Sequence, residues 1–433
     1  MKTLLIALSL LQASPSFDQP WTLQRCIDWA LEHNLTVERS AAAVQSKEID
    51  KNTADWSWAP SVSAQAGQTW NFGRGIGGDN TYEKGNSAST SFTLGAGMTL
   101  FDGLATPQRM KLAALNLEAA TADLDKARED VRVAVTRAYV QVLYNYEIRD
   151  VAREQLSIDS LQVARLEGMF DSGMASAADV SQQKASMAQS LLTLIQAQNN
   201  VTSALLDLSQ LLELPSFQGF EVVRPAVEVE ELYMGLPDDI YADALGLRPA
   251  IRAEQLRLEG TARSLSIAKA AYLPSLSLNA GLGTNYYTSF ASQGFWNQLN
   301  SNFSQYVGLT LTVPIFNRMS TRNAVRSAQL QRRTQEIQLR LAQQELYKEI
   351  QQAWNGAVAA RVKYDASSQA VLAARDAFDL TQAKYENGKA TFTEFNESRN
   401  RLAKAQSECA QATYEYLFQT RLVEFYRGGE LKL

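Results

Sequence analysis

The chain has 433 residues, 45% of them hydrophobic, and a formal net charge of −5 at pH 7. This charge excludes the basic surface that nucleic-acid binding needs, so we expect no nucleic-acid partner. The single histidine, His33, argues against a histidine-based metal site or catalytic triad. We therefore expect no catalytic residue, no bound metal and no cofactor.

The two cysteines, Cys26 and Cys409, are too few for a disulfide framework and wrongly spaced for zinc. They could pair in an oxidising compartment, but two separate buried thiols are the alternative that we favour.

Residues 1–16 have the pattern of a secretory signal peptide. Lys2 gives a basic start, Leu4 to Leu11 form a short apolar stretch, and Ser14 and Ser16 supply small residues for cleavage. About eight residues are too few to span a bilayer, and no later apolar run approaches the required length of about 20. We expect an exported protein whose route into any membrane uses strands.

The chain carries an internal repeat. The segment "WAPSVSAQAG" from Trp58 matches "YLPSLSLNAG" from Tyr272, and "FDSGMAS" from Phe170 matches "YENGKAT" from Tyr385. Both pairs lie at nearly the same offset, which predicts one long unit that occurs twice. We predict a first repeat over 17–213, a linker over 214–243, a second repeat over 244–427 and a C-terminal tail over 428–433.

Each repeat contains two strands with alternating apolar and polar residues, joined by a polar loop. An apolar-Pro-Ser signal at Pro60 and Pro274 ends a preceding helix, which runs from Leu23 to about Ser57 or from about Pro249 to Ala271. The predicted strands are 61–72 and 275–286, then 92–100 and 307–313, and the loops are 71–89 and 285–303. About ten to twelve residues suit a strand that crosses a membrane at a tilt.

Two very long helices follow, over 106–171 and 318–387. In the first, Ala113, Ala120, Ala127 and Ala134 recur every seven residues, and so do Leu117, Leu124, Val131 and Ala138. This is the seam of a coiled coil. Gly173 and Gly388 end the long helices, because glycine accepts the positive φ of a tight turn. Returning helices are predicted over 177–212 and 392–426.

Four strands are too few to close a barrel, for which about eight are the minimum. Either the strands pack against helices in a soluble domain, or several chains share one barrel. Long polar loops at one end of the strands favour the shared barrel.

The chain resembles the TolC family of outer-membrane efflux and secretion channels. The resemblance is carried by the duplicated unit and by the turns "FDSGMASAADV" and "YENGKATFTEF". It implies a membrane α+β fold, in which three chains build a 12-stranded outer-membrane β-barrel, four strands per chain, continued by a long α-helical coiled-coil tunnel in the periplasm. Residues 214–243 would be an equatorial linker beside the tunnel.

The resemblance also implies the function. The protein would be a passive exit duct of a tripartite efflux pump or type I secretion system, exporting small molecules or polypeptides, and not an enzyme. Its partners would be two further copies, outer-membrane lipid, and a periplasmic adaptor (membrane fusion protein) that links it to an inner-membrane pump. The bacterial outer membrane would be its location.

The resemblance assigns roles to residues at the two turns. Three acids would narrow the periplasmic aperture (Asp179, Glu394 and Glu397), and six residues would form the adaptor-docking edge (Gly173, Met174, Ser176, Gly388, Lys389 and Thr391). The simpler reading makes these an ordinary helical turn with acids at helix N-termini, and both can hold. Ala390 departs from family members that carry an arginine there, which leaves open how the aperture is locked.

Two other functions compete. A coiled-coil structural or adhesin-like envelope protein without a pore would keep the heptads but would not need the matched hairpins. An enzyme lacks an obvious site, since the glycine-rich "GRGIGG" near Gly73 sits at a hairpin tip with no helix after it.

Overall fold

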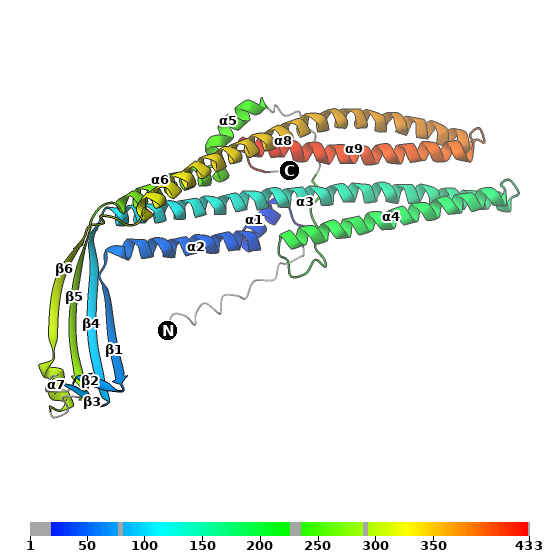
Figure 1. The fold of residues 1–433 in the computed structure, drawn as a ribbon. Helices are drawn as coiled ribbons and strands as arrows, with labels where there is room; N and C mark the ends of the chain where they lie inside the picture. Colours follow the sequence, from blue (N-terminus) through cyan, green and yellow to red (C-terminus); the bar gives the residue numbers. More distant parts are fainter. Residues whose placement is uncertain (1–18, 77–80, 226–234, 289–292, 432–433) are drawn as a thin grey trace. The chain divides into compact units, whose positions relative to one another are not determined.

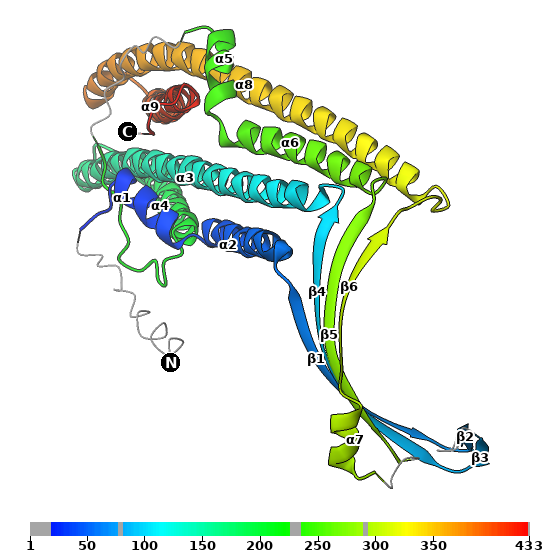
Figure 2. The ribbon, with the colours of Figure 1, turned by 90° about the vertical axis from the view of Figure 1, so that its left-hand side faces the viewer.

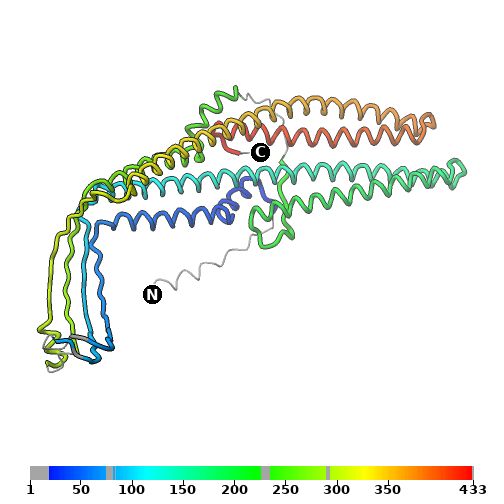
Figure 3. The backbone as a smooth tube through the Cα atoms, in the orientation of Figure 1, coloured from blue at the N-terminus to red at the C-terminus, as the bar shows by residue number. Residues whose placement is uncertain are grey.

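The computed structural model describes residues 19–76, 81–225, 235–288 and 293–431, which Figure 3 traces along the chain. The predicted signal peptide, 1–16, lies outside the described residues. The chain forms two compact units: Met1–Ala42, Ala122–Arg252 and Leu341–Leu433 make the first, and Ala43–Thr121 with Ala253–Arg340 the second. The long helices α3 (Ala105–Asp171) and α8 (Ser320–Glu386) contribute to both units. Among the described helices, none is long and apolar enough to cross a bilayer.

The second unit contains a four-stranded antiparallel sheet in the order β1-β4-β5-β6. The strands are β1 (Ser61–Asn71), β4 (Ser87–Asp102), β5 (Ser275–Tyr287) and β6 (Ser304–Thr312). They lie side by side in Figure 1, and Figure 2 shows that the sheet curves along its length. The expected four strands are therefore present in one sheet, and β1 and β6 are its edges.

The pairing register sorts the side chains onto two different faces. Val62 pairs with Ala96, Ala96 with Ala280, and Ala280 with Val307, so these apolar residues share a face. The opposite face carries small or polar residues, such as Ser63 opposite Gly95. Alternation along each strand produces this division, because successive side chains point to opposite sides.

The strand ends and loops differ from the sequence-based expectation. β4 starts five residues before Phe92, because the polar run from Ser87 to Ser91 also pairs. β6 ends at Thr312, before Pro314, which has no N–H to donate to a ladder. The first polar loop, predicted over 71–89, holds a small hairpin of β2 (Arg74–Ile76) and β3 (Tyr82–Lys84). The second holds the short helix α7 (Phe295–Ser301).

Two helical hairpins, whose turns lie in the first unit, have matching dimensions. The long helices α3 and α8 have 67 residues each, and the returning helices α4 (Ala177–Leu211) and α9 (Phe392–Tyr426) have 35 each. These bounds agree with the predicted helices within one or two residues. The turns of the two hairpins lie at the same end of the unit in Figure 1.

The shorter helices are interrupted where the sequence analysis expected none. The predicted helix 23–57 is two helices, α1 (Leu23–His33) and α2 (Leu35–Asp55), followed by the short 3-10 helix η1 (Trp56–Trp58). Asn34 between α1 and α2 has an extended backbone, with ψ 126°, and its side-chain N–H donates to the carbonyl of Leu211 at 2.9 Å. Asparagine favours such local breaks because its side chain replaces backbone partners.

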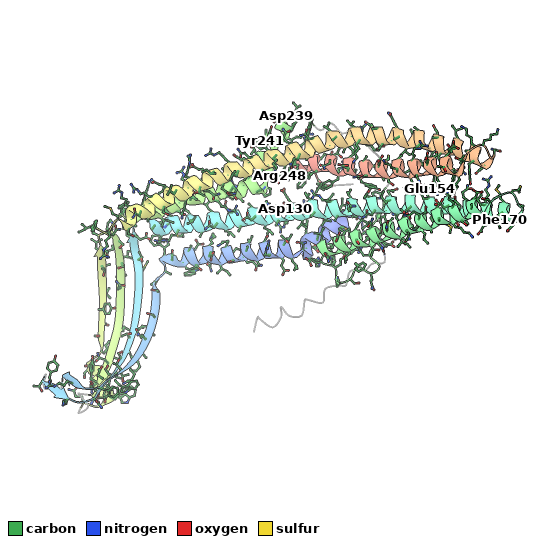
Figure 4. The ribbon with its side chains drawn as sticks, turned by 45° about the vertical axis from the view of Figure 1, so that its right-hand side comes forward. Asp130, Glu154, Phe170, Asp239, Tyr241 and Arg248 are labelled. Atoms are coloured by element: carbon green, nitrogen blue, oxygen red, sulfur yellow. The ribbon has the colours of Figure 1, made fainter. Side chains whose placement is uncertain are left out.

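The second repeat contains a similar interruption. Helix α5 (Pro237–Leu247) precedes α6 (Pro249–Ala270), and it runs across the predicted boundary at residue 244. Arg248 separates them with an extended backbone, as expected for a residue before a proline. Its guanidinium donates to the carbonyl of Phe425 at the end of α9 and forms an ion pair with Glu129 on α3 at 3.1 Å. Figure 4 labels Arg248 at this junction.

The heptad seam of α3 is present only in part. Leu124, Ala127 and Val131 are buried as predicted, but the next buried positions are Val135 and Tyr139 rather than Ala134 and Ala138. A straight helix has 3.6 residues per turn, so its buried stripe drifts away from a strict seven-residue repeat.

The cysteines are not bonded. Cys26 is buried, Cys409 is only partly buried, and both thiols are free. The favoured expectation of two buried thiols therefore holds for Cys26 alone.

Candidate functional site

The two hairpin turns share one backbone design. Gly173 and Gly388 have φ of +73° and +70°. In the first turn the N–H of Met174 donates to the carbonyl of Met169 at 2.7 Å, and in the second the N–H of Lys389 donates to that of Lys384 at 2.8 Å. Such bonds across a left-handed glycine end a helix abruptly, so the chain can reverse at these residues.

A capping box starts each returning helix. Ser176 and Thr391 accept a hydrogen bond from the backbone N–H of Asp179 and Glu394, and those carboxylates accept from the backbone N–H and hydroxyl of Ser176 and Thr391. The bonds from Thr391 lower the pKa of Glu394 below its usual value of 4.5. Two predicted aperture acids therefore stabilise helix N-termini, as the simpler reading expected.

The remaining predicted site residues lie on the surface of the turns. On the first turn, the side chain of Met174 is 69% exposed. On the second turn, Gly388 and Lys389 are also exposed. Glu397 is also exposed, and within the described part of the chain it forms no hydrogen bond or ion pair. Phe170, labelled at the end of α3 in Figure 4, adds a second large apolar side chain to the first turn. The turns thus present backbone, the apolar side chains of Met174 and Phe170, and the charged side chain of Lys389 to their surroundings.

The two turns are linked to each other within the chain. Arg165 on α3 donates to the carbonyl of Glu386 at 2.9 Å, and its guanidinium lies 3.7 Å from the carboxylate of the same residue. Burial and the nearby carboxylate of Asp179 raise the pKa of Tyr385, so the first turn approaches the end of α8. Ala390 offers no cation here, and Arg165 supplies one from the neighbouring hairpin.

Below the turns lies a buried polar cluster that sequence reasoning missed. The carboxylate of Asp159 on α3 is fully buried and forms an ion pair with Arg399 on α9, which is 5% exposed. From α4, the side-chain amide of Gln183 donates to the carboxylate of Asp159 at 3.0 Å. The hydroxyl of Ser190, also on α4, donates to the same carboxylate at 2.5 Å. The cluster joins three helices of the two hairpins. No local motif marks it, because its members come from distant parts of the sequence.

Apolar side chains next to this cluster complete the contact between the hairpins. Phe378, Phe395 and Leu402 form a buried group that includes Ile158 of α3 at its margin. Tyr385 stacks on Phe395 with ring centroids 4.9 Å apart.

The sheet presents an apolar surface that nothing in the described chain covers. Val307 and Leu309 leave 77% and 66% of their surface exposed, and Trp70 leaves 63%. An exposed apolar face of this extent needs a lipid or protein partner. The edge strands β1 and β6 also keep unpaired backbone groups, which lipid does not tolerate.

A comparison with known families identifies the chain. The model of the outer membrane efflux protein family matches residues 26–213 and 240–424. The chain belongs to the outer membrane efflux protein family. The resemblance found in the sequence is thus confirmed, and so is the predicted role in outer-membrane efflux.

Individual relatives in this family match over most of their length. The outer membrane efflux protein BepC of Brucella suis is 22% identical over 397 residues, which cover 91% of this chain and 82% of the relative. The outer membrane protein TolC of Escherichia coli is 24% identical over 403 residues, covering 89% and 80%.

Solved structures share the fold. The outer membrane channel CmeC of Campylobacter jejuni matches with a TM-score of 0.81 at 18% identity, covering 98% of this chain and 92% of that one. The outer membrane protein VceC of Vibrio cholerae matches with a TM-score of 0.79 at 20% identity, covering 95% and 97%.

Proposed function

We propose that this outer membrane efflux protein is a passive exit duct, the outer-membrane part of a tripartite efflux pump or type I secretion system. The observation that carries the proposal is the sheet, with one mostly apolar face, one polar face and two unpaired edges. Such a sheet suits lipid on one side and water on the other. The duct itself performs no chemistry and needs no cofactor.

Three chains would complete the barrel. Four strands cannot close, whereas twelve form a barrel wide enough for a channel. In this arrangement β6 of one chain pairs with β1 of the next, so every edge is satisfied. The strands would lie in the outer membrane and the helices in the periplasm.

We also propose that the unit arose by internal duplication, with the domain boundaries predicted from the sequence. Equal helix lengths in the two hairpins support this, and so do the two interruptions. Asn34 and Arg248 lie at equivalent positions, and each donates to the end of its returning helix, at Leu211 and Phe425. The linker 214–243 then includes the beginning of α5.

The turns are the proposed entrance. Met174 and Lys389 and their neighbours would form the edge that docks a periplasmic adaptor, which connects to an inner-membrane pump. In a trimer, Glu394 and Glu397 would form carboxylate rings around the entrance, and Asp179 would lie beside them. Such rings favour cations. Exposure of Glu397 without a partner in the described chain supports its place in a ring.

The competing proposal, a coiled-coil envelope protein without a pore, explains the helices equally well. It gives no reason for a four-stranded sheet with an uncovered apolar face, so the duct is favoured.

Single-channel recording in planar bilayers tests both the duct and its entrance. The wild-type protein should form discrete cation-preferring channels, and Glu394→Gln with Glu397→Gln should reduce the cation preference. Glutamine can keep the capping box, so the helix is preserved. Glu424→Gln, an acid on the opposite side of α9 from Glu397 at 3.6 residues per turn, is the control and should leave the selectivity unchanged. Absence of any channel contradicts the duct, and unchanged selectivity in the double variant contradicts only the acidic rings.

A further inference from the structure

On the polar face of the sheet, the ring of Tyr306 occupies the space that a side chain at Gly281 would fill. Gly281 on β5 pairs directly with Tyr306 on β6. A Cβ atom at Gly281 would lie 2.5 Å from Cε1 of Tyr306, 2.8 Å from Cζ and 2.9 Å from the hydroxyl oxygen. The ring therefore leans across the strand onto the backbone of Gly281, and any larger residue there would displace it.

Tyr306 is unusual for its face. Apart from Tyr287 at the loop end of β5 and Asp102 at the other end of β4, the described strand residues on this face are serine, threonine, asparagine, glutamine or glycine. Tyr306 lies within β6 and is 62% exposed. It is therefore the largest side chain in the middle of the polar surface.

The other glycines on this face do not hold a ring. A Cβ at Gly283, the next residue of β5 on the same face, would meet its nearest atom, Cγ2 of Thr93, at 3.7 Å, which is an ordinary contact. A Cβ at Gly308, the next residue of β6 on this face, would meet nothing within 4 Å. The tightest of the remaining glycines on this face is Gly67, whose Cβ would lie 3.1 Å from a serine hydroxyl, so among the described strand glycines of this face only Gly281 accommodates an aromatic ring.

We propose that Tyr306 sets the width of the barrel lumen at its level, and that Gly281 holds its ring flat against the wall. The proposal rests on the duct proposed above, in which the polar face lines the lumen. Three chains would place three such rings in the lumen at one height. With glycine at 281 the rings lie along the wall and leave the passage open. A side chain at 281 would push each ring away from the wall into the passage.

Polymer exclusion in planar bilayers measures this width. Poly(ethylene glycol) of graded size is added on the side of the strand loops, and the largest polymer that enters the lumen and lowers the conductance is recorded. Gly281→Val should shift this cut-off to smaller polymers. Gly283→Val is the matched control and should leave it unchanged. Adding Tyr306→Ala to Gly281→Val should restore the wild-type cut-off or raise it. Where Gly281→Val does not insert, Gly281→Ala is used in its place.

Three results would overturn the inference while leaving the duct intact: an unchanged cut-off in Gly281→Val, an equal shift in Gly283→Val, and a shift that persists after Tyr306→Ala is added. The last result would show that the valine itself fills the lumen. Failure of the wild-type protein to form any channel is a separate result, and it contradicts the duct.

Discussion

At the residue scale, the buried ion pair of Asp159 and Arg399 leads to a stability prediction. Arg399→Met alone should destabilise the protein by about 3–5 kcal/mol, because Asp159 is left buried without its charge partner. Adding Asp159→Leu should recover much of the loss, since removing both charges avoids their desolvation. Thermal unfolding followed by circular dichroism measures both variants.

A surface pair provides the control for this prediction. Arg128 and Asp125 lie about one helical turn apart on α3, and each leaves nearly half of its side chain exposed. Arg128→Met should cost less than about 1 kcal/mol. Equal losses for Arg128→Met and Arg399→Met would show that the buried pair has no special role.

The turns could be predicted from the sequence, and the buried cluster beneath them could not. Gly173, Gly388 and the Ser or Thr with an acid three residues later are local patterns, and local patterns are readable in a sequence. Asp159 and Arg399 become partners only because two hairpins pack together. Neither has a neighbour in sequence that marks it as buried.

At the element scale, the long helices were predicted closely, whereas the breaks in the shorter helices were missed. Heptad periodicity extends over many turns and marks α3 strongly. Asn34 is a single residue in an otherwise helical pattern, and its partner at Leu211 belongs to a different helix. A break that depends on a tertiary hydrogen bond leaves almost no local signal.

The turn glycines give a prediction with opposite signs at two nearby positions. Gly173→Ala should destabilise the protein by about 1–2 kcal/mol, because a residue with a Cβ disfavours positive φ. Gly168→Ala, five residues earlier inside α3 and with open space around it, should stabilise it by up to about 1 kcal/mol. The melting temperatures of the two variants test this prediction: that of Gly173→Ala should fall and that of Gly168→Ala should rise. A higher melting temperature for Gly173→Ala would contradict the turn geometry.

At the scale of the whole molecule, the sheet is the feature that one chain cannot satisfy alone. Its strands and its two faces could be predicted from alternation along 61–72 and 275–286. The hairpin and helix in the loops could not, because short elements in polar loops depend on tertiary contacts. One such contact is the bond from the hydroxyl of Thr284 to the carbonyl of Leu299 on α7.

The central claim is that sister chains complete the barrel that four strands begin. The mass of the purified, detergent-extracted particle, measured by native mass spectrometry after the detergent is stripped in the gas phase, tests it most directly. The account predicts a particle of three chains that requires detergent and separates into single chains on heating. A single chain that stays in solution without detergent would contradict it.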